Sequence, residues 1–274
     1  MNPALLVLPS TINIIGASYR EIAETAPTSY IEVNYENMYL SYKPYNKLAS
    51  EYEEAIRAAH AAGRRVPVIH APYESWLMHV GSNGIEELAN TVTSLGVKVM
   101  VFHLPSTRYG DAWQDAIKTL SRLQDKYNVE VAVENLVAAP PWSNPHRLAE
   151  TANKHGISLC IDTGHLHLNG YDTAEIIDKY LDMIRVLHVH DNHGTSDEHL
   201  IVGAGTINWL RAAASIRRAA ENGSWIVLEE KCIARREGIS ACKARLILQA
   251  ASMTGMVTGW NGYRKLLEGG IRTR

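Results

Sequence analysis

Six short apolar segments of this sequence each end on a histidine or a carboxylate. VPVIH ends at His70, VKVMVFH at His103, VEVAVE at Glu134, ISLCIDTGH at Asp162 and His165, IRVLHVH at His188 and His190, and WIVLEE at Glu229 and Glu230. Strand interiors disfavour Asp and Glu. Imidazole and carboxylate are the ligands of zinc, manganese and related divalent ions, whereas Ca²⁺ and Mg²⁺ prefer almost only oxygen. The pattern therefore indicates strand ends that converge on a metal.

The segments between these residues supply the elements that must position them. Runs rich in Val and Ile alternate with longer amphipathic stretches, which is typical of repeated βα units around a parallel sheet. We predict strands near 4–10, 29–36, 66–70, 97–103, 129–134, 157–162, 184–190 and 225–229. We predict helices near 18–25, 47–62, 83–95, 111–127, 145–155, 173–182, 207–221 and 239–252. Eight strands and eight helices predict a (β/α)8 barrel, an α/β fold in which the loops after the strands share one face.

The length of the chain fits one such barrel. It has 274 residues, and α/β barrels of about 250 residues commonly form one domain. No Pro/Gly/Ser-rich linker interrupts the sequence, so we expect a single domain over residues 1–274. Residues 255–274 follow the eighth helix as a C-terminal extension. It would either cover a barrel end or contact a second copy in a homo-oligomer.

Charge and cysteine content narrow the class of protein. The formal net charge is -2, and scattered Lys and Arg give no footprint for nucleic acid, although a local basic patch stays open. Cys160, Cys232 and Cys242 are too few and too unevenly spaced for a disulfide framework, and no CxxC pair exists. No basic leader or membrane-length apolar run is present. We expect a cytoplasmic protein without a membrane partner.

Seven motifs carry a resemblance to a known family. They are HAPY at 70–73, FHLPS at 102–106, ENL at 134–136, IDTGH at 161–165, LHVHDN at 187–192, DEHLIVGAGTINW at 197–209 and VLEE at 227–230. Together they resemble the xylose isomerase-like TIM barrels. That superfamily contains sugar and sugar phosphate isomerases and epimerases, and also the endonuclease IV type of apurinic/apyrimidinic endonuclease (AP endonuclease family 2). The resemblance runs from about residue 66 to 230 and implies a TIM barrel.

The resemblance also implies a set of metal ligands. By motif they are His70, His103, Glu134, Asp162, His165, His188, Asp197, His199 and Glu229. These nine fill every position of the endonuclease's trinuclear zinc pattern. The isomerase and epimerase branch uses fewer, and its matches are Glu134, Asp162, His188 and Glu229, with His165 beside the substrate. We therefore expect one to three divalent ions as cofactors, zinc or manganese first.

Two choices depend on the resemblance, because strand geometry alone does not make them. Alternation along a strand puts His188 and His190 on the same face, so periodicity cannot choose between them. The resemblance selects His188. Glu229 and Glu230 point to opposite faces, so only one can enter the site. The resemblance selects Glu229.

The candidates also have purely structural explanations. Glu134 could form a structural ion pair, and Asp162 could cap a helix or form an Asx turn. His70 and His103 could be satisfied histidines of the core. The two candidates in the polar stretch DNHGTSDEHL could be solvated loop residues. Gly203 and Gly205 could present backbone N–H groups to a phosphate or could form a tight turn.

Isomerisation or epimerisation of a small sugar or sugar phosphate is the first of two compatible reactions. A metal would polarise a carbonyl and its adjacent hydroxyl. Glu134 and Glu229 would then remove and return the carbon-bound proton as general base and general acid, with His165 as the third catalytic residue. The arginine that sugar epimerases of this family usually place shortly after the strand-seven histidine has no clear counterpart. The nearby positions read DEH at 197–199.

The second compatible reaction is phosphodiester hydrolysis at abasic DNA sites by a trinuclear zinc centre. After HAPY, the endonucleases continue with an apolar pair and Asn, whereas this chain has Glu74, Ser75 and Trp76. An acidic residue there would oppose the phosphate backbone. The endonuclease signatures DTCH and HLND read DTGH and HVHD in this sequence. The sequence therefore favours the first reaction.

Overall fold

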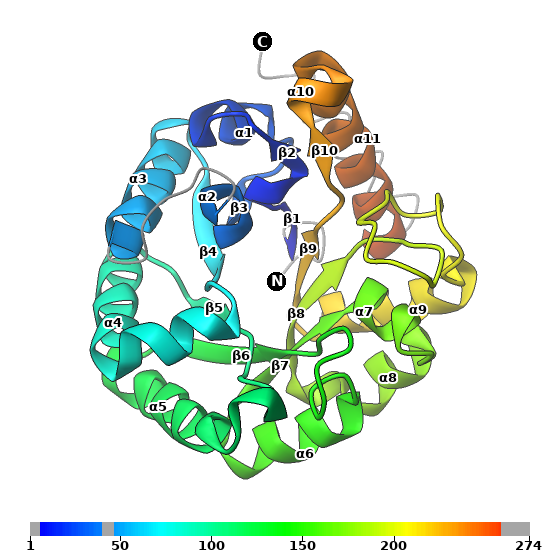
Figure 1. The fold of residues 1–274 in the computed structure, drawn as a ribbon. Coiled ribbons are helices and arrows are strands. Elements are labelled where there is room, and N and C mark those ends of the chain that lie inside the picture. The colour runs from blue at the N-terminus through cyan, green and yellow to red at the C-terminus, as the bar shows by residue number, and fades with distance from the viewer. Residues whose placement is uncertain (1–5, 40–46, 259–274) are drawn as a thin grey trace.

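Eight parallel strands form a nearly closed barrel at the centre of the molecule, and helices surround it (Figure 1). The computed structural model describes residues 6–39 and 47–258. The barrel strands are β1 (Val7–Pro9), β3 (Tyr30–Asn34), β4 (Arg65–His70), β5 (Val99–Phe102), β6 (Glu130–Glu134), β7 (Ser158–Asp162), β8 (Ile184–Val189) and β9 (Trp225–Leu228). β1 pairs with β9, and a parallel bridge between Ser10 and Glu32 joins the β1 end to β3. The predicted TIM barrel is confirmed.

The main helices alternate with these strands as the sequence predicts. They are α1 (Tyr19–Thr25), α3 (Leu48–Ala61), α4 (Glu74–Ser94), α5 (Ala112–Tyr127), α6 (Pro145–Lys154), α8 (Thr173–Lys179), α9 (Trp209–Glu221) and α11 (Ile239–Thr258). Short elements lie between them: η2 (Thr11–Asn13), α2 (Tyr35–Tyr39), η4 (Thr107–Tyr109), α7 (Thr163–Leu168), η5 (Leu181–Met183) and α10 (Ala234–Glu237). Two-residue strands β2 (Ile14–Ile15) and β10 (Cys232–Ile233) pair beside the barrel.

Three predicted boundaries differ from the structure. α4 begins at Glu74 instead of near 83, and its backbone is interrupted at Gly81, where φ is 60°. α7 starts directly after Asp162, in a segment for which no helix range was predicted, and Asp162 is its N-cap, one of the two structural alternatives for this residue. α11 continues to Thr258, so the first residues of the expected C-terminal extension belong to this helix. Residues 259–274 of that extension lie outside the described part of the chain.

The cysteines correct one expectation. Cys232 and Cys242 form a disulfide between β10 and α11, and Cys160 is free and buried. The link forms because the pairing of β10 with β2 places Cys232 against the buried side of α11. Cysteine spacing therefore no longer argues for a reducing compartment. Within the described residues, no helix combines the length and the apolar character needed to cross a membrane.

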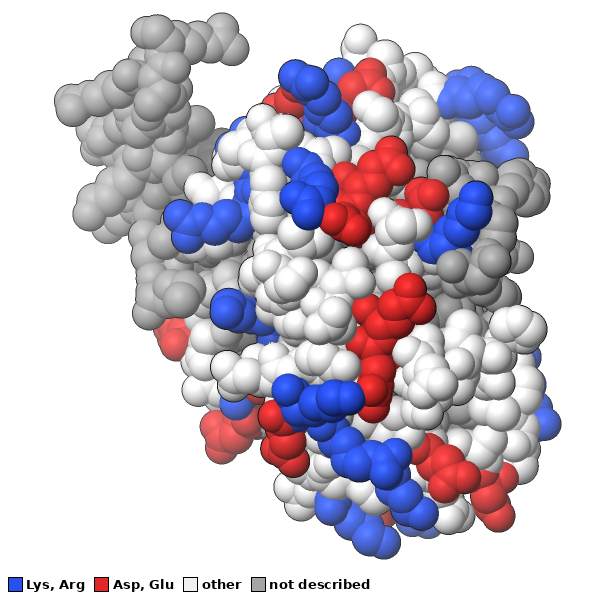
Figure 2. Space-filling view, turned by 90° about the vertical axis from the view of Figure 1, so that its left-hand side faces the viewer, with Lys and Arg blue, Asp and Glu red and all other residues white. Residues whose placement is uncertain are grey.

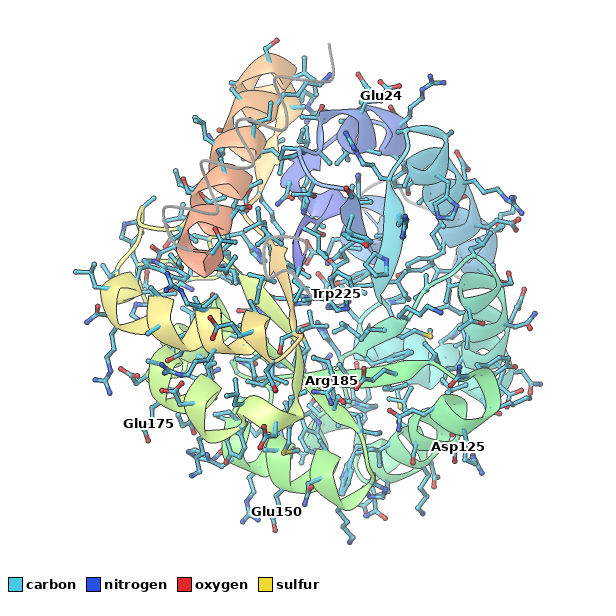
Figure 3. The ribbon with its side chains drawn as sticks, turned by 180° about the vertical axis from the view of Figure 1, so that it is seen from behind. Glu24, Asp125, Glu150, Glu175, Arg185 and Trp225 are labelled. Atoms are coloured by element: carbon cyan, nitrogen blue, oxygen red, sulfur yellow. A yellow bond between two sulfur atoms is a disulfide. The ribbon has the colours of Figure 1, made fainter. Side chains whose placement is uncertain are left out.

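Apolar side chains fill the barrel interior. Leu8, Val68, Val99, Val101, Ala132, Cys160, Val186 and Val227 form a buried cluster of their own, separate from the larger core between the strands and the helices. At the amino ends of the strands, Tyr30 packs edge-on against Trp225, and Arg185 pairs with Glu130 at 2.6 Å. Figure 3 views this end, with Arg185 and Trp225 near its middle. The amino end of the barrel is thus packed, and the opposite end is left for a site.

One buried carboxylate holds the loop that follows β8. Asp191 accepts hydrogen bonds from the backbone N–H groups of Gly203 (3.0 Å), Gly205 (2.9 Å) and Ile207 (3.2 Å), and from Trp209 Nε1 (2.7 Å). A Cβ on Gly205 would lie 2.3 Å from a backbone oxygen, so no side chain fits there. The glycine N–H groups are therefore used in a tight turn, which was one of the two alternatives for them.

Asp191→Ala should lower the free energy of unfolding by about 3 kcal/mol, because several buried donors lose a charged acceptor at once. Urea denaturation followed by circular dichroism measures the change. Asp125→Ala is the matched control, since Asp125 is exposed on α5 (Figure 3). Equal unfolding midpoints for the two variants would contradict this role of Asp191.

Candidate metal centre

Each barrel strand directs a polar side chain into the barrel at or near its carboxyl end. These residues are Ser10, Glu32, His70, His103, Glu134, Asp162, His188 and Glu229, and all are buried. Two positions earlier on each strand lie residues of the apolar cluster inside the barrel, Leu8, Val68, Val101, Ala132, Cys160, Val186 and Val227, and the half-buried Tyr30, which packs against that cluster. Because side chains alternate along a strand, residues two apart share a face. These eight polar side chains therefore lie directly above an apolar layer, and we call them the polar layer.

Glu134 lies at the centre of one group in this layer. Its Oε2 is 2.8 Å from His70 Nε2, 3.2 Å from His103 Nε2 and 3.4 Å from His188 Nδ1. Burial alone would raise the pKa of Glu134, but His188 and His103 outweigh it and hold this pKa well below its ordinary value. The carboxylate therefore stays ionised inside the barrel. The simple ion-pair alternative is incomplete, because three imidazoles converge on a single oxygen.

The histidines are oriented by backbone carbonyls. Nδ1–H of His70 donates to Ala71 O (2.6 Å), that of His165 to Asn135 O (2.8 Å), and that of His199 to Glu229 O (2.7 Å). In each ring Nε2 is left facing the carboxylates. Metal-binding histidines commonly have one nitrogen anchored in this way. The core-histidine alternative for His70 does not explain why its second nitrogen points at Glu134.

Glu32 is a member of the site that the motifs did not identify. It is fully buried, accepts from Ser10 Oγ (2.8 Å) and lies 3.2 Å from His188 Nε2. The other nitrogen of His188, Nδ1, has no hydrogen-bond partner among the described residues. It lies 3.4 Å from Glu134 and 3.5 Å from Glu229. A buried nitrogen left without a partner is costly, and one placed between two carboxylates fits a cation.

A second group surrounds Asp162 and Asp197. His190 Nε2 lies 3.0 Å from Asp162 Oδ2, and Asp162 Oδ1 caps α7 by accepting from the backbone of His165 (2.7 Å). Asp162 thus serves as a helix cap with one oxygen and faces the site with the other. Asp197 approaches three Nε2 atoms, those of His199 (3.1 Å), His165 (3.5 Å) and His190 (3.7 Å). The loop residues Asp197 and His199 are therefore part of the site.

Only one of the paired glutamates enters the polar layer. Glu229 Oε1 accepts from Asn34 Nδ2 at 2.9 Å, and burial raises the pKa of Glu229 to about 8. Glu230 is also buried, but neither of its carboxylate oxygens has a hydrogen-bond partner among the described residues. Of the two, Glu229 is the one that lies among the histidines.

The arrangement can hold divalent ions. Among the described residues, four sets of three have potential ligand atoms within 4.8 Å of one another. They are His70/Glu134/His188, Glu32/His188/Glu229, Asp162/His165/His190 and His190/Asp197/His199. Their mixture of imidazole nitrogen and carboxylate oxygen suits zinc, manganese and related ions. The structure brings together all nine residues selected from the sequence, and it adds Glu32 and His190 to them.

A cavity of about 350 Å³ opens beside these groups. Its lining residues include His103, His165 and Asp197 of the site, together with Tyr73 and Arg108. The volume suits a small molecule. Any substrate in it would meet the imidazoles directly.

Comparisons with known proteins agree with the fold. A family model described as "Xylose isomerase-like TIM barrel" matches residues 20–245. A probable endonuclease 4 of Staphylococcus saprophyticus is 28% identical over 199 residues, which cover 61% of this chain and 66% of that protein. The chain spans 57% and 66% of the length of two curated relatives that it matches.

Solved structures share the fold at lower identity. The 3-keto-D-glucoside 4-epimerase YcjR of E. coli, in its apo form, superposes with a TM-score of 0.69 at 15% identity, covering 89% of this chain and 98% of that one. An IolI protein with a bound zinc atom superposes with a TM-score of 0.61 at 18% identity, covering 92% and 97%. At these identities the likeness concerns the fold.

Glu134→Gln should weaken the binding of divalent metal by about tenfold or more, because a neutral amide is a poor ligand and no longer balances the imidazoles. Metal per chain is measured by mass spectrometry after dialysis, with circular dichroism to verify folding. Glu175→Gln, on the exposed side of α8 (Figure 3), is the control. Parental metal content in Glu134→Gln would remove this residue from the ligand set.

Glu32→Gln should lower metal affinity by about 10- to 100-fold. The substitution leaves His188 in place, whose Nδ1 faces both Glu134 and Glu229. The amide can donate to His188 Nε2, which would move the ring proton to Nδ1 and block it as a ligand. Chelator competition gives the dissociation constant. If Glu32→Gln binds metal as tightly as the parent, the carboxylate does not set the tautomer of His188.

Proposed function

Since this chain belongs to the xylose isomerase-like TIM barrel family, we propose that it is a divalent-metal-dependent isomerase or epimerase of a small sugar or sugar phosphate. The observation that supports this most is the pair of buried carboxylates, Glu134 and Glu229, which lie 3.4 Å and 3.5 Å from His188 Nδ1. Two such groups can remove a proton from one face of a carbon and return a proton to the other face. The neighbouring cavity has the volume of a small-molecule site.

The residues of the polar layer have separable tasks in this reaction. A bound divalent ion supplies polarisation of the substrate carbonyl and its adjacent hydroxyl, which makes the carbon-bound proton acidic. Glu134 removes that proton as general base, and Glu229 returns one as general acid. His165, whose ring is fixed by Asn135 and lines the cavity, contacts the substrate. The apolar layer below keeps water away from the carboxylates.

The epimerase neighbours support the same class of substrate. E. coli YcjR, a 3-keto-D-glucoside 4-epimerase, matches over nearly its whole length. The zinc in the IolI structure supports a metal in this barrel type. The arginine expected in the loop after β8 is absent, and a different one, Arg108 of η4, lies at the cavity wall. We propose that substrate contacts come from this side of the barrel.

Hydrolysis of abasic DNA is the second candidate, favoured by the endonuclease 4 relatives and by the nine occupied ligand positions. The formal net charge of -2 argues against it, and acidic and basic side chains are also interspersed on the side of the barrel shown in Figure 2. Binding to a phosphate backbone normally uses a continuous basic surface. We therefore place this activity second.

Isotope exchange separates the two candidates. The metal-loaded protein, incubated with a panel of ketoses and ketose phosphates in deuterated water, should place deuterium next to the carbonyl of at least one substrate. Glu229→Gln, at matched metal content, should lower exchange by about 100-fold or more, whereas Glu175→Gln should not. NMR detects the deuterium, and chromatography detects the isomer when a shielded proton exchanges little.

The contradictory result is equally specific. No exchange and no isomer across the panel, together with cleavage of a duplex that carries an abasic analogue, would replace the isomerase by the phosphodiesterase.

A further inference from the structure

Two departures from the endonuclease motifs meet in space. DTGH has Gly164 where the endonuclease motif has Cys, and HVHD has His190 where it has Asn. A Cβ on Gly164 would lie 2.0 Å from His190 Cε1 and 2.6 Å from each of its ring nitrogens. No side chain at position 164 is therefore compatible with the present position of the ring. The two differences from the endonuclease motifs are therefore coupled, because the absence of a side chain at Gly164 leaves the space that the imidazole of His190 occupies.

The ring of His190 is held on both sides. Gly164 borders it on one side, and the ring of His199 stacks on it with centroids 3.9 Å apart and planes 17° apart. The residue is fully buried. Its Nδ1 faces the backbone oxygen of Asp191 at 3.5 Å. Its orientation is thus fixed by packing.

The other nitrogen of His190 points at two carboxylates. Nε2 lies 3.0 Å from Asp162 Oδ2 and 3.7 Å from Asp197 Oδ1. Asp197 in turn approaches Nε2 of His165 and of His199. Asp162, His165 and His190 therefore form one set of possible ligands, and His190, Asp197 and His199 form another, so His190 belongs to both sets. Such a set of lone pairs is stable when a cation lies among them.

We propose that His190 is a metal ligand through Nε2, at an ion position shared with Asp162 and Asp197 and distinct from the position between Glu134 and Glu229. Gly164 is the residue that admits this ligand. The mixed nitrogen and oxygen donors select a divalent transition ion or zinc. The inference rests on the metal dependence proposed above, and it adds a ligand that the motif resemblance does not supply.

The alternative for His190 is a protonated imidazole paired with Asp162. Both arrangements place Nε2 near the same oxygen, but they respond differently to substitution. A ligand contributes to the affinity and to the electronic spectrum of a bound ion, whereas a buried ion pair contributes to folding only. Metal measurements therefore separate the two.

His190→Asn is the first variant, and His60→Asn on the exposed face of α3 is its control. Each protein is titrated with Co²⁺ and with Zn²⁺, and affinity is measured by chelator competition. In His190→Asn we expect one ion to bind about tenfold or more weakly and the Co²⁺ absorption bands to change. His60→Asn should match the parent in both measurements.

Gly164→Ala supplies an independent variant, because it displaces the ring while His190 remains in the sequence. It should weaken the same ion. The double variant Gly164→Ala/His190→Asn should be no worse than the weaker single variant, since both substitutions remove one interaction. In the double variant the methyl group can occupy the space left by the ring, so it is expected to fold even where Gly164→Ala does not.

The outcomes distinguish this inference from the proposed function. Parental ion number, affinity and Co²⁺ spectrum in His190→Asn or in the folded double variant would overturn ligation by His190 and leave the isomerase proposal intact. A parent protein that binds no divalent ion at all would overturn both.

Discussion

The burial of several ionisable groups inside one barrel is the constraint on which the rest of this structure depends. Glu32, Glu134, Asp162 and Glu229 are all nearly inaccessible to solvent, and moving a carboxylate out of water costs several kcal/mol even after relaxation. The protein offsets this cost with imidazoles, which surround Glu134 and Asp162 on several sides. The cost remains visible at Glu229, whose pKa burial raises to about 8. Bound cations would stabilise the same arrangement further.

Strand alternation and loop anchoring position the site residues in two different ways. The group around Glu134 comes from strand ends, whose inward direction is set by the apolar residue two positions earlier. The group around Asp197 depends on a loop, which Asp191 holds through backbone N–H groups. Rigid strands and an anchored loop therefore meet at Asp162, which both faces the site and caps α7.

Local periodicity predicted the barrel and the polar strand ends, whereas the set of nine candidate ligands was selected by the motif resemblance. Strand runs that end on His70, Glu134 or Asp162 are recognisable without a structure. Glu32 was missed because Asn34 and Tyr35 continue the polar pattern beyond it, so its strand has no sharp polar end. The alternation rule could have found it, since Tyr30 is the apolar residue two positions earlier.

Other features needed three-dimensional contacts. Alternation could not choose between His188 and His190. In the structure, the ring of His188 lies beside Glu134 and the ring of His190 lies beside Asp162. The disulfide between Cys232 and Cys242 depends on the pairing of β10 with β2, two strands too short to carry a sequence pattern. α7 begins at the residues TGH, and the glycine at its second position does not indicate a helix in the sequence.

Anomalous diffraction tests the central claim that the polar layer is a metal site. Crystals of protein purified with zinc and manganese, measured above and below each absorption edge, should show anomalous peaks among Glu134, His188 and Glu229 and among Asp162, His190 and Asp197. Well-ordered side chains in this layer without any anomalous peak, from protein saturated with these ions, would contradict the account.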